Sequence, residues 1–260
     1  MEKTIIVNNL TKTFRLSKKQ MKLDQTTSPL KVAVDDISFY TNEGEVFGLL
    51  GPNGAGKTTT LRCIATLIKP DKGEITINGI DSKNEVQIKK RIAFLTNELK
   101  LDEQFTPNYI FNYFAYFHGL TENEIKERKH DLFTRFGIDK FAEVKIGELS
   151  TGMKQKVSIV MSLVHNPDII IFDEPTNGLD VLTAKLVTDY LKELRDKGKT
   201  IIISTHIMSL VTKICDRVGI IINGKLVICD TVENVCNLSS TGDIEDVFFD
   251  LYNKEVGEEQ

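Results

Sequence analysis

One segment, residues 45–64, constrains the fold more than any other part of the sequence. Residues 45–50 (EVFGLL) are an apolar run typical of a buried strand, residues 51–58 read GPNGAGKT, and residues 59–64 (TTLRCI) can begin a helix. The middle part matches G-x-x-x-x-G-K-T, a phosphate-binding loop that needs a strand before it and a helix after it. Its glycines permit a tight turn and a close approach of the backbone to an anion. The segment therefore predicts an α/β fold built around such a loop.

The residue types in this loop indicate what each can do. Successive backbone N–H groups point inward, and the helix N-terminus adds positive potential. Lys57 supplies a cation for the outer phosphates, and the hydroxyl of Thr58 can hold Mg²⁺. The alternative is a glycine-rich turn with a chance Lys-Thr pair, and the strand–loop–helix context argues against it.

A second apolar run, residues 169–172 (IIIF), ends in two carboxylates, Asp173 and Glu174. An uninterrupted apolar run is typical of a strand in the middle of a parallel sheet, covered on both faces. Asp173 would then lie at the carboxyl end of the strand, where ligands bind in open α/β sheets, and could hold Mg²⁺. Glu174 could orient or deprotonate an attacking water. Alone the pair would be a polar strand end, but beside the phosphate loop we interpret it as catalytic.

Two further segments place polar residues at element ends. Ser150 lies where a helix N-cap belongs, because residues 149–156 (LSTGMKQK) open an amphipathic helical pattern. His206 follows the apolar run 201–205, so it would lie at the same sheet edge as Lys57 and Asp173. On their own these are an ordinary helix start and a surface histidine. The apolar stripe of the predicted helix consists of Met153, Val157, Val160, Met161 and Val164.

Taken in this order, the segments resemble the ABC (ATP-binding cassette) ATPases over residues 3–235. In that resemblance Asp173 and Glu174 close the Walker B motif, Asp180 ends the D-loop (residues 178–180, GLD), and His206 is the switch histidine. Phe14 matches the aromatic residue that stacks on adenine, although a Phe on a strand is more often a core residue. The Walker A positions, which would bind the nucleotide, are Gly51, Pro52, Asn53, Gly54, Ala55, Gly56, Lys57, Thr58 and Thr59.

The chain departs from the family pattern at two motifs. Residues 149–153 (LSTGM) stand in place of the signature, usually LSGGQ, and keep Ser150 and Gly152, so contact with a γ-phosphate is still expected. Asn97 stands where the family usually has Gln. Asn carries the same amide donors and acceptor on a side chain one methylene shorter. We therefore expect Asn97 to reach Mg²⁺ or its water, directly or through another water.

The resemblance implies an α/β fold of the P-loop NTPase type. It comprises a RecA-like parallel-sheet core, an antiparallel β layer, and a helical subdomain at about residues 102–166, followed by an acidic C-terminal tail at 240–260. Strands are predicted at 4–16 and 32–40 with a polar surface loop between them. The pairs Asn78-Gly79 and Asn223-Gly224 predict tight hairpins. The aromatic run 109–117 is predicted to lie in the core, with part of it open to a membrane partner.

The resemblance also implies a mechanism and partners. Two cassettes pack head to tail, so that ATP and Mg²⁺ lie between Walker A of one copy and Ser150 and Gly152 of the other. Asp180 reports the state of one site to the other. The second ATP-binding subunit is expected to be an identical copy, with a different ATP-binding subunit as the alternative. An integral-membrane permease places the protein peripherally on the cytoplasmic face of the membrane.

Residues 65–67, 94–96 and 150–157 resemble bacterial exporters, especially the sodium-efflux (NatA-like) branch. The alternatives are export of drugs, bacteriocins or surface polymers, a soluble ABC ATPase that does not transport, and a small-molecule kinase or other P-loop enzyme.

Composition is consistent with these expectations. The chain has 260 residues and a net charge of −4, so nothing favours nucleic acid as a partner. No apolar run reaches the ~18 residues of a membrane-spanning helix. The four cysteines show no C-x-x-C spacing, which favours reduced thiols and no metal. Among them, Cys63 is expected at a buried helix position.

Overall fold

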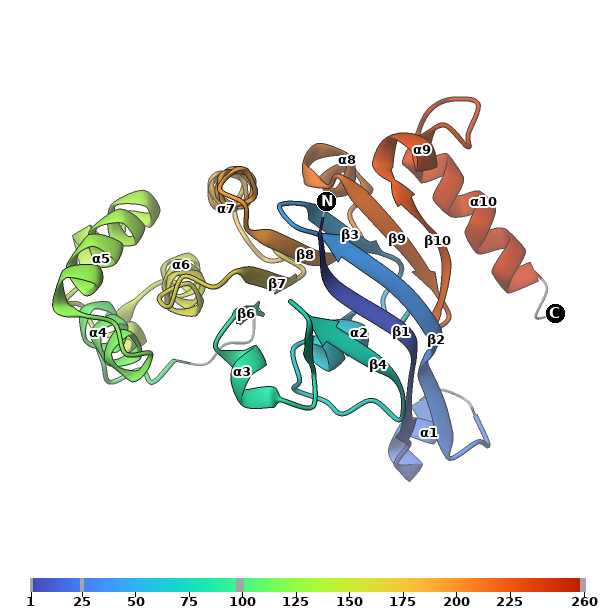
Figure 1. The fold of residues 1–260 in the computed structure, drawn as a ribbon, viewed down its shortest axis with the longest axis horizontal. Helices are drawn as coiled ribbons and strands as arrows, with labels where there is room; N and C mark the ends of the chain where they lie inside the picture. The colour runs from blue at the N-terminus through green and yellow to red at the C-terminus, as the bar shows by residue number, and fades with distance from the viewer. Residues whose placement is uncertain (1, 24–25, 97–100, 258–260) are drawn as a thin grey trace.

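The protein, described here by a computed structural model for residues 2–23, 26–96 and 101–257, is organised around two β-sheets (Figure 1). The larger sheet has the strand order β10-β9-β3-β8-β7-β6. Its strands from β9 to β6 run parallel, and β10 is antiparallel to β9. The strands are β3 (Val46–Leu50), β6 (Ile92–Leu95), β7 (Ile169–Asp173), β8 (Thr200–Thr205), β9 (Arg217–Ile222) and β10 (Lys225–Thr231).

The smaller sheet is antiparallel, with the order β2-β1-β4-β5. Its strands are β1 (Lys3–Arg15), β2 (Leu30–Asn42), β4 (Lys72–Ile77) and β5 (Ile80–Asp81). Both predicted Asn-Gly hairpins are confirmed, since they join β4 to β5 and β9 to β10, with positive φ at all of these Asn and Gly residues. Positive φ at both turn residues is what a type I′ turn requires. The polar segment predicted as a loop instead contains a short helix, α1 (Lys18–Leu23), with no buried residue.

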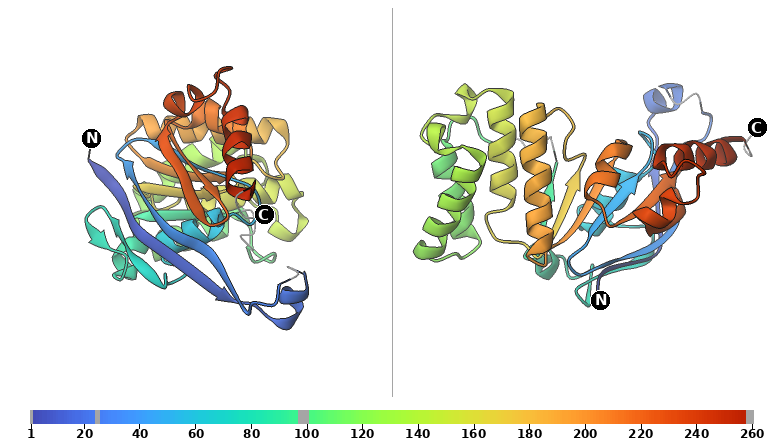
Figure 2. Two further views of the ribbon diagram at one scale, coloured as in Figure 1. Left: turned by 90° about the vertical axis from the view of Figure 1, so that its right-hand side faces the viewer. Right: turned by 90° about the horizontal axis from the view of Figure 1, so that it is seen from above.

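Helices α4 to α6 form a layer beyond β6, and α6 packs against that strand (Figure 2). Thr106 and Thr121 cap α4 and α5, and Ser150 caps α6, each by accepting a backbone N–H. The prediction of a parallel core, an antiparallel layer and a helical subdomain is therefore confirmed. The helices of this layer are α4 (Pro107–Phe117), α5 (Glu122–Phe136) and α6 (Thr151–Ser162), with two 3₁₀ turns, Asp139–Phe141 and Ile146–Glu148.

The remaining helices cover the sheets. They are α2 (Lys57–Ile64), α3 (Glu85–Lys89), α7 (Val181–Asp196), α8 (Met208–Ile214), α9 (Val232–Cys236) and α10 (Ile244–Gly257). The segment predicted as an acidic tail folds as α10, because Ile244, Val247 and Phe248 bury one helical face against the core. None of the helices within the described ranges combines the length and the apolar character needed to cross a bilayer.

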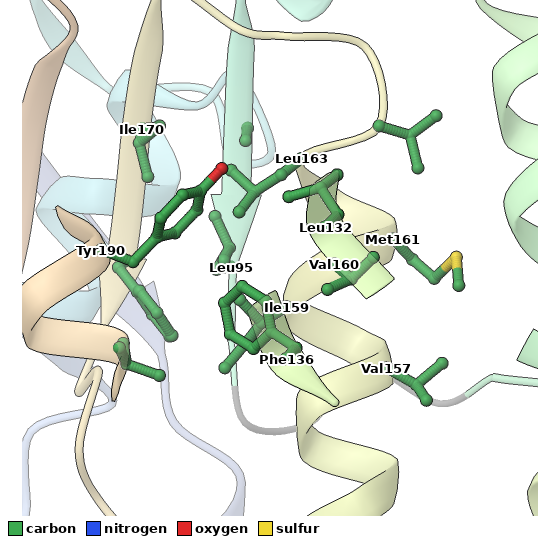
Figure 3. Close-up of a cluster of buried hydrophobic side chains, with 14 of the residues drawn as sticks. Leu95, Leu132, Phe136, Val157, Ile159, Val160, Met161, Leu163, Ile170 and Tyr190 are labelled. Atoms are coloured by element: carbon green, nitrogen blue, oxygen red, sulfur yellow. The ribbon is translucent and has the colours of Figure 1, made fainter. Parts of the chain in front are cut away.

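Side chains from α5, α6 and α7 meet the edge of the parallel sheet in one buried cluster (Figure 3). Phe136 packs edge-on against Tyr190, with ring centroids 5.5 Å apart. The predicted stripe faces this cluster, since Val157 and Val160 on α6 and Val164 just past its end are fully buried, while Met153 is partly buried. Burial of this stripe fixes the N-terminus of α6 relative to β7, which matters for the site described below.

The aromatic run on α4 is only half buried, contrary to the prediction that most of it is core. Phe111 is fully buried, whereas Tyr109, Tyr113 and Phe117 are 53%, 59% and 76% exposed. The reason is helical geometry, because one stripe of α4 meets the core and the aromatics continue around the opposite side.

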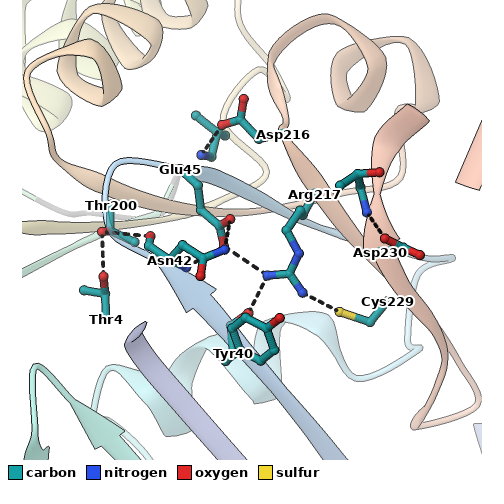
Figure 4. A network of polar contacts seen from close by, with 11 residues as sticks. Thr4, Tyr40, Asn42, Glu45, Thr200, Asp216, Arg217, Cys229 and Asp230 are labelled. Atoms are coloured by element: carbon teal, nitrogen blue, oxygen red, sulfur yellow. Dashed lines mark hydrogen bonds and ion pairs between the residues drawn. The ribbon is translucent and has the colours of Figure 1, made fainter. Parts of the chain in front are cut away.

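A polar network joins the two sheets at the end opposite the phosphate loop (Figure 4). The guanidinium of Arg217 donates to the Tyr40 carbonyl oxygen (2.9 Å), lies 3.3 Å from Glu45 Oε1, and stacks over the Tyr40 ring. Glu45 also accepts the backbone N–H of Asn42 at 2.7 Å. Buried charges of this kind stabilise only when their partners are in place, so the network ties the end of β2 in the smaller sheet to the start of β9 in the larger sheet.

A histidine pair lies where the helical layer meets the parallel sheet. The rings of His118 and His165 stack with centroids 4.3 Å apart, and His165 Nε2 donates to the carbonyl oxygen of Ile92 at 3.0 Å. Burial, together with the nearby charges of His118, Arg128 and Lys199, lowers the pKa of His165 to about 4, while the hydrogen bond to the Ile92 carbonyl acts in the opposite direction. The pair therefore favours neutral rings at this joint.

Candidate functional site

The predicted phosphate-binding loop joins β3 to α2. Gly56 caps α2 with φ 106°, and Gly54 has φ 82°. A Cβ on Gly51 would overlap the carbonyl oxygen of Ile221, and one on Gly56 would overlap that of Ala33. The loop can follow this path only with glycine at these positions, because it is pressed between β9 and β2.

Lys57 lies at the start of α2, inside the curve of the loop. Its Nζ donates to the carbonyl oxygens of Gly51 (2.7 Å) and Pro52 (3.1 Å) and lies 3.7 Å from Glu174 Oε1. The side chain is only 5% exposed, and this burial lowers the pKa of Lys57, while the charges of Glu174 and Asp173 act in the opposite direction. The loop therefore holds a cation directly beside the carboxylates of β7.

Asp173 ends β7 at the same sheet edge. Its Oδ1 accepts a hydrogen bond from Thr58 Oγ1 at 3.0 Å and another from the Ser204 hydroxyl. The register of β7 with β8 explains this meeting, because Asp173 pairs with Ser204 across the two parallel strands. The structure thus brings together the hydroxyl and the carboxylate that were predicted to hold Mg²⁺.

Glu174 has a backbone conformation that is unusual for a residue with a side chain. Its φ is 54°, and its N–H donates to the carbonyl oxygen (3.1 Å) and the hydroxyl (3.2 Å) of Ser204. Strained backbone of this kind persists when surrounding bonds over-determine it, and it clusters at functional sites. Glu174 Oε1 lies 3.1 Å from Nδ1 of His206, whose side chain is 43% exposed. Lys57, Glu174 and His206 therefore form one contiguous polar group.

Ser204 is a site residue that the sequence reasoning missed. Its hydroxyl and carbonyl oxygens connect Asp173 to Glu174. A signal was present, since Ser204 is a polar residue at the end of the otherwise apolar run that precedes His206.

The signature residues lie with the D-loop. Ser150 Oγ accepts the backbone N–H of Met153 at 3.3 Å as the N-cap of α6. A Cβ on Gly152 would lie 3.9 Å from Asp180 Oδ2, and Gln155 Nε2 donates to the Gly178 carbonyl oxygen at 3.4 Å. The signature and D-loop residues lie beside α6, which packs against β6. The group around Lys57 lies at the start of α2, which packs against β7 and β8 (Figure 1).

Asp180 is the N-cap of α7. It accepts the backbone N–H groups of Leu182 and Thr183, both at 3.0 Å, and the Thr183 hydroxyl at 2.6 Å. The hydrogen bond from the Thr183 hydroxyl is the largest cause holding the pKa of Asp180 below its usual range. The carboxylate therefore stays charged at the start of α7.

Phe14 lies next to the end of β1 and is 36% exposed. The Nζ of Lys12 lies 5.6 Å from the centroid of its ring. An exposed ring of this kind can receive a base by stacking, which is what the resemblance predicted.

Asn97 lies outside the described residues. The residues before it are described, and a cavity of about 410 Å³ opens between the end of β6 and α6. Leu95, Thr96 and Phe172 line its sheet side, and Lys154 and Gln155 line its helical side.

The residues present fit a nucleotide with Mg²⁺. The glycines leave a loop whose backbone can approach phosphate, and Thr58 and Asp173 offer the oxygen ligands that Mg²⁺ prefers. Within the described ranges no three His, Cys, Asp or Glu side chains are placed to hold a metal ion. An ion here would therefore depend on this hydroxyl, this carboxylate, phosphate oxygens and water, as Mg²⁺ commonly does.

Comparison with known proteins agrees with this geometry. The family described as "ABC transporter" matches residues 34–177. The ABC transporter ATP-binding protein NatA of Bacillus subtilis is 40% identical over 218 residues, 83% of this chain and 89% of that protein. The linearmycin resistance ATP-binding protein LnrL of the same organism is 36% identical, over 80% of this chain and 67% of that protein. The Nod factor export ATP-binding protein I of Burkholderia thailandensis is 37% identical, over 75% of this chain and 64% of that protein.

Solved structures show the same architecture. The ATP-binding subunit of an ABC transporter superposes with a TM-score of 0.82 at 27% identity, covering 95% of this chain and 99% of that one. The dimeric post-hydrolysis state of the cassette MJ0796 bound to ADP and Pi superposes with a TM-score of 0.76 at 26% identity, covering 87% and 98%.

Proposed function

Since the chain belongs to the ABC transporter family, we propose that it is the ATP-binding and ATP-hydrolysing subunit of an exporter whose permease is a separate membrane protein. One observation carries the proposal. Lys57, Asp173 and Glu174 converge at the carboxyl ends of β3 and β7, and His206 joins them from the end of β8. A cation, a metal-binding carboxylate and a candidate base are thus within reach of one phosphate-binding loop.

Each residue has a role in this proposal. The loop amides and Lys57 bind the phosphate chain, and Phe14 stacks on the base. Mg²⁺, held by Thr58 and Asp173, would neutralise charge on phosphate oxygens. Glu174 orients the attacking water and takes its proton, and His206 holds the Glu174 carboxylate in place at 3.1 Å.

A second copy of the chain completes the site in this proposal. Ser150 and Gly152 lie with Asp180 beside α6, apart from the group around Lys57. The dimeric cassette with ADP and Pi supports a two-copy arrangement for this fold. In such a dimer the N-terminus of α6 would meet the γ-phosphate with N–H groups and a favourable dipole.

The proposal extends to the surface that contacts the permease and to the transported cargo. The exposed aromatics of α4, Tyr109 and Tyr113 among them, offer the large rigid contacts that are enriched at protein interfaces. We propose this face as part of the permease contact, which places the protein at the cytoplasmic face of the membrane. Sodium is the cargo that the resemblance to the NatA-like branch favours. The relatives named for Nod factor export and linearmycin resistance support export of a different cargo, such as a drug, as the alternative.

The catalytic assignment is tested by phosphate release from ATP. Glu174→Gln should still bind ATP, and turnover should fall about 100-fold or more, as expected for loss of a general base. Glu85→Gln, an exposed glutamate on α3, is the matched control and should keep its turnover. Wild-type turnover in Glu174→Gln would remove Glu174 from this role.

The two-copy site is tested at the signature. Ser150→Arg should abolish turnover while each chain still binds ATP. Thr121→Arg also removes an N-cap, that of α5, and so controls for cap loss alone. Full activity in Ser150→Arg would refute the shared site.

The partner is tested by capture from the host membrane. Glu174→Gln, tagged and held in ATP, should retain a multi-span membrane protein in mild detergent, and Tyr109→Ala/Tyr113→Ala should weaken that retention. Capture of cytosolic partners alone would favour an ABC ATPase that does not transport.

A further inference from the structure

The strand that presents Phe14 is irregular near that residue. The β1–β2 register shifts between Leu10 and Lys12 and again between Lys12 and Thr13. On its other side, β1 pairs with β4 only as far as Thr11, opposite Lys72. Strand ends with few ladder bonds are the parts of a sheet that open most easily. Pairing with β2 resumes at Thr13, Phe14 and Arg15, so it is the β4 side of this strand end that needs bonds from outside the ladder.

Asp71 supplies two such bonds directly before Phe14. Its Oδ2 accepts the backbone N–H of Thr13 at 2.6 Å, and its Oδ1 accepts the ammonium of Lys12 at 2.9 Å. The Asp71 N–H donates to the Thr11 carbonyl oxygen at 2.9 Å. The Lys12 side chain is 14% exposed and that of Asp71 is 43% exposed, so one partner of the ion pair is buried and the other faces solvent. The Lys12 hydrogen bond is also the largest cause that holds the pKa of the Asp71 carboxyl below its usual range.

The clamp that Asp71 forms with Lys12 and Thr13 is connected to α2, the helix that follows the phosphate-binding loop. Asp71 follows the turn after α2, where the N–H groups of Leu67 and Ile68 both donate to the Arg62 carbonyl oxygen. Cys63, in the last turn of α2, is buried, and α2 packs against β1. The helix thus begins at the phosphate loop and ends beside the clamp.

We propose that Asp71 is a positioning residue for nucleotide binding, which holds Phe14 at a fixed place relative to the phosphate-binding loop through Lys12 and Thr13. The proposal rests on the proposed function, because it assumes that Phe14 receives the base. Asp71 itself touches no nucleotide in this account. Its carboxylate ties the base platform to the distal end of α2, so that base and phosphates are bound together by one preorganised unit.

The test is a double-mutant cycle on the dissociation constant of Mg·ATP, measured in the Glu174→Gln protein so that ATP is not consumed. Phe14→Ala should raise this constant about 5- to 150-fold, the range that loss of one base–aromatic stack produces. Asp71→Ala should raise the dissociation constant about 5-fold when Phe14 is present and less than about 2-fold in the Phe14→Ala protein, because the two residues act as one unit. Asp71→Asn, which keeps an acceptor for the Thr13 N–H, should recover part of the affinity.

A control and a second readout separate positioning from folding. Glu85→Ala removes an ion pair of 2.6 Å on α3 and should leave the dissociation constant unchanged. With an active Glu174, Asp71→Ala should raise KM for ATP with little change in kcat, whereas a general loss of folded protein would lower kcat and leave KM unchanged.

Three outcomes decide the matter. An equal effect of Asp71→Ala with and without the Phe14 ring would overturn the proposal while leaving the proposed function intact. No effect of Phe14→Ala would overturn both the base platform and the role of Asp71. Absence of ATP hydrolysis in the wild-type protein would instead reject the proposed function itself.

Discussion

The stacked histidines between the helical layer and the sheet should make stability fall in mild acid. His165 has a folded pKa of about 4 against the ordinary 6.5 expected when the chain unfolds. Between pH 6.5 and pH 4 the imidazole of His165 is protonated in the unfolded state but not in the folded state. The free energy of unfolding therefore decreases as pH falls from 6.5 towards 4. At pH 5 the difference amounts to about 2 kcal/mol relative to pH 7.5.

The measurement is the midpoint of thermal unfolding at the two pH values. For a chain of this size, about 2 kcal/mol corresponds to a decrease of roughly 4–8 °C. His165→Gln keeps a side-chain donor for the Ile92 carbonyl oxygen but cannot take up the proton, so its decrease should be smaller by that amount. His130→Gln, at an exposed position on α5, is the matched control and should behave like the wild type.

Titrating carboxylates also contribute to the pH dependence, but they are shared by all three proteins and cancel in the comparison. The same decrease in His165→Gln as in the wild type would show that the buried ring does not control acid stability. A smaller decrease in His130→Gln would show that the effect is not specific to the stacked pair.

Two matched pairs of substitutions test the loop and the helical layer. Gly56→Ala places a Cβ against the Ala33 carbonyl oxygen, whereas Gly79 also has a positive φ (73° against 106°) but open space around it. Gly56→Ala should therefore be less stable than Gly79→Ala by about 2 kcal/mol in urea unfolding, and equal stabilities would show that the loop has room to shift. On α4, Phe111→Ala should lose about 3–5 kcal/mol, because the ring is fully buried, while Tyr113→Ala should change stability by less than about 0.5 kcal/mol. A large loss in Tyr113→Ala would mean that the exposed face of α4 is packed.

Local features of the sequence were enough to predict several elements correctly. The phosphate-binding loop depends on adjacent residues, because the strand, the glycines and the helix follow one another within a single segment. Both Asn-Gly hairpins were predicted because positive φ at two neighbouring residues is a local requirement. Cys63 is buried as expected, with 1% exposure, since it lies on the inner face of α2.

Two features of the fold did not follow from the sequence, because there a residue's environment depends on distant parts of the chain. The aromatics of α4 are equally apolar in sequence, but only one stripe of the helix meets the core, which leaves Tyr113 and Phe117 exposed. The acidic composition of the C-terminal segment concealed three apolar residues at helical spacing, and the surface formed by β9, α8 and α9 gives them a place to pack.

The sequence by itself determined the chemistry that the site offers, and the tertiary structure decided how that chemistry is assembled. Lys57, Asp173 and His206 could be named from their positions after apolar runs, because parallel strands end at a common edge. The role of Ser204 between Asp173 and Glu174, and of Asp71 before Phe14, could not be derived in this way. Side-chain pairing across such separations depends on register and loop path, which only the packing of both sheets fixes.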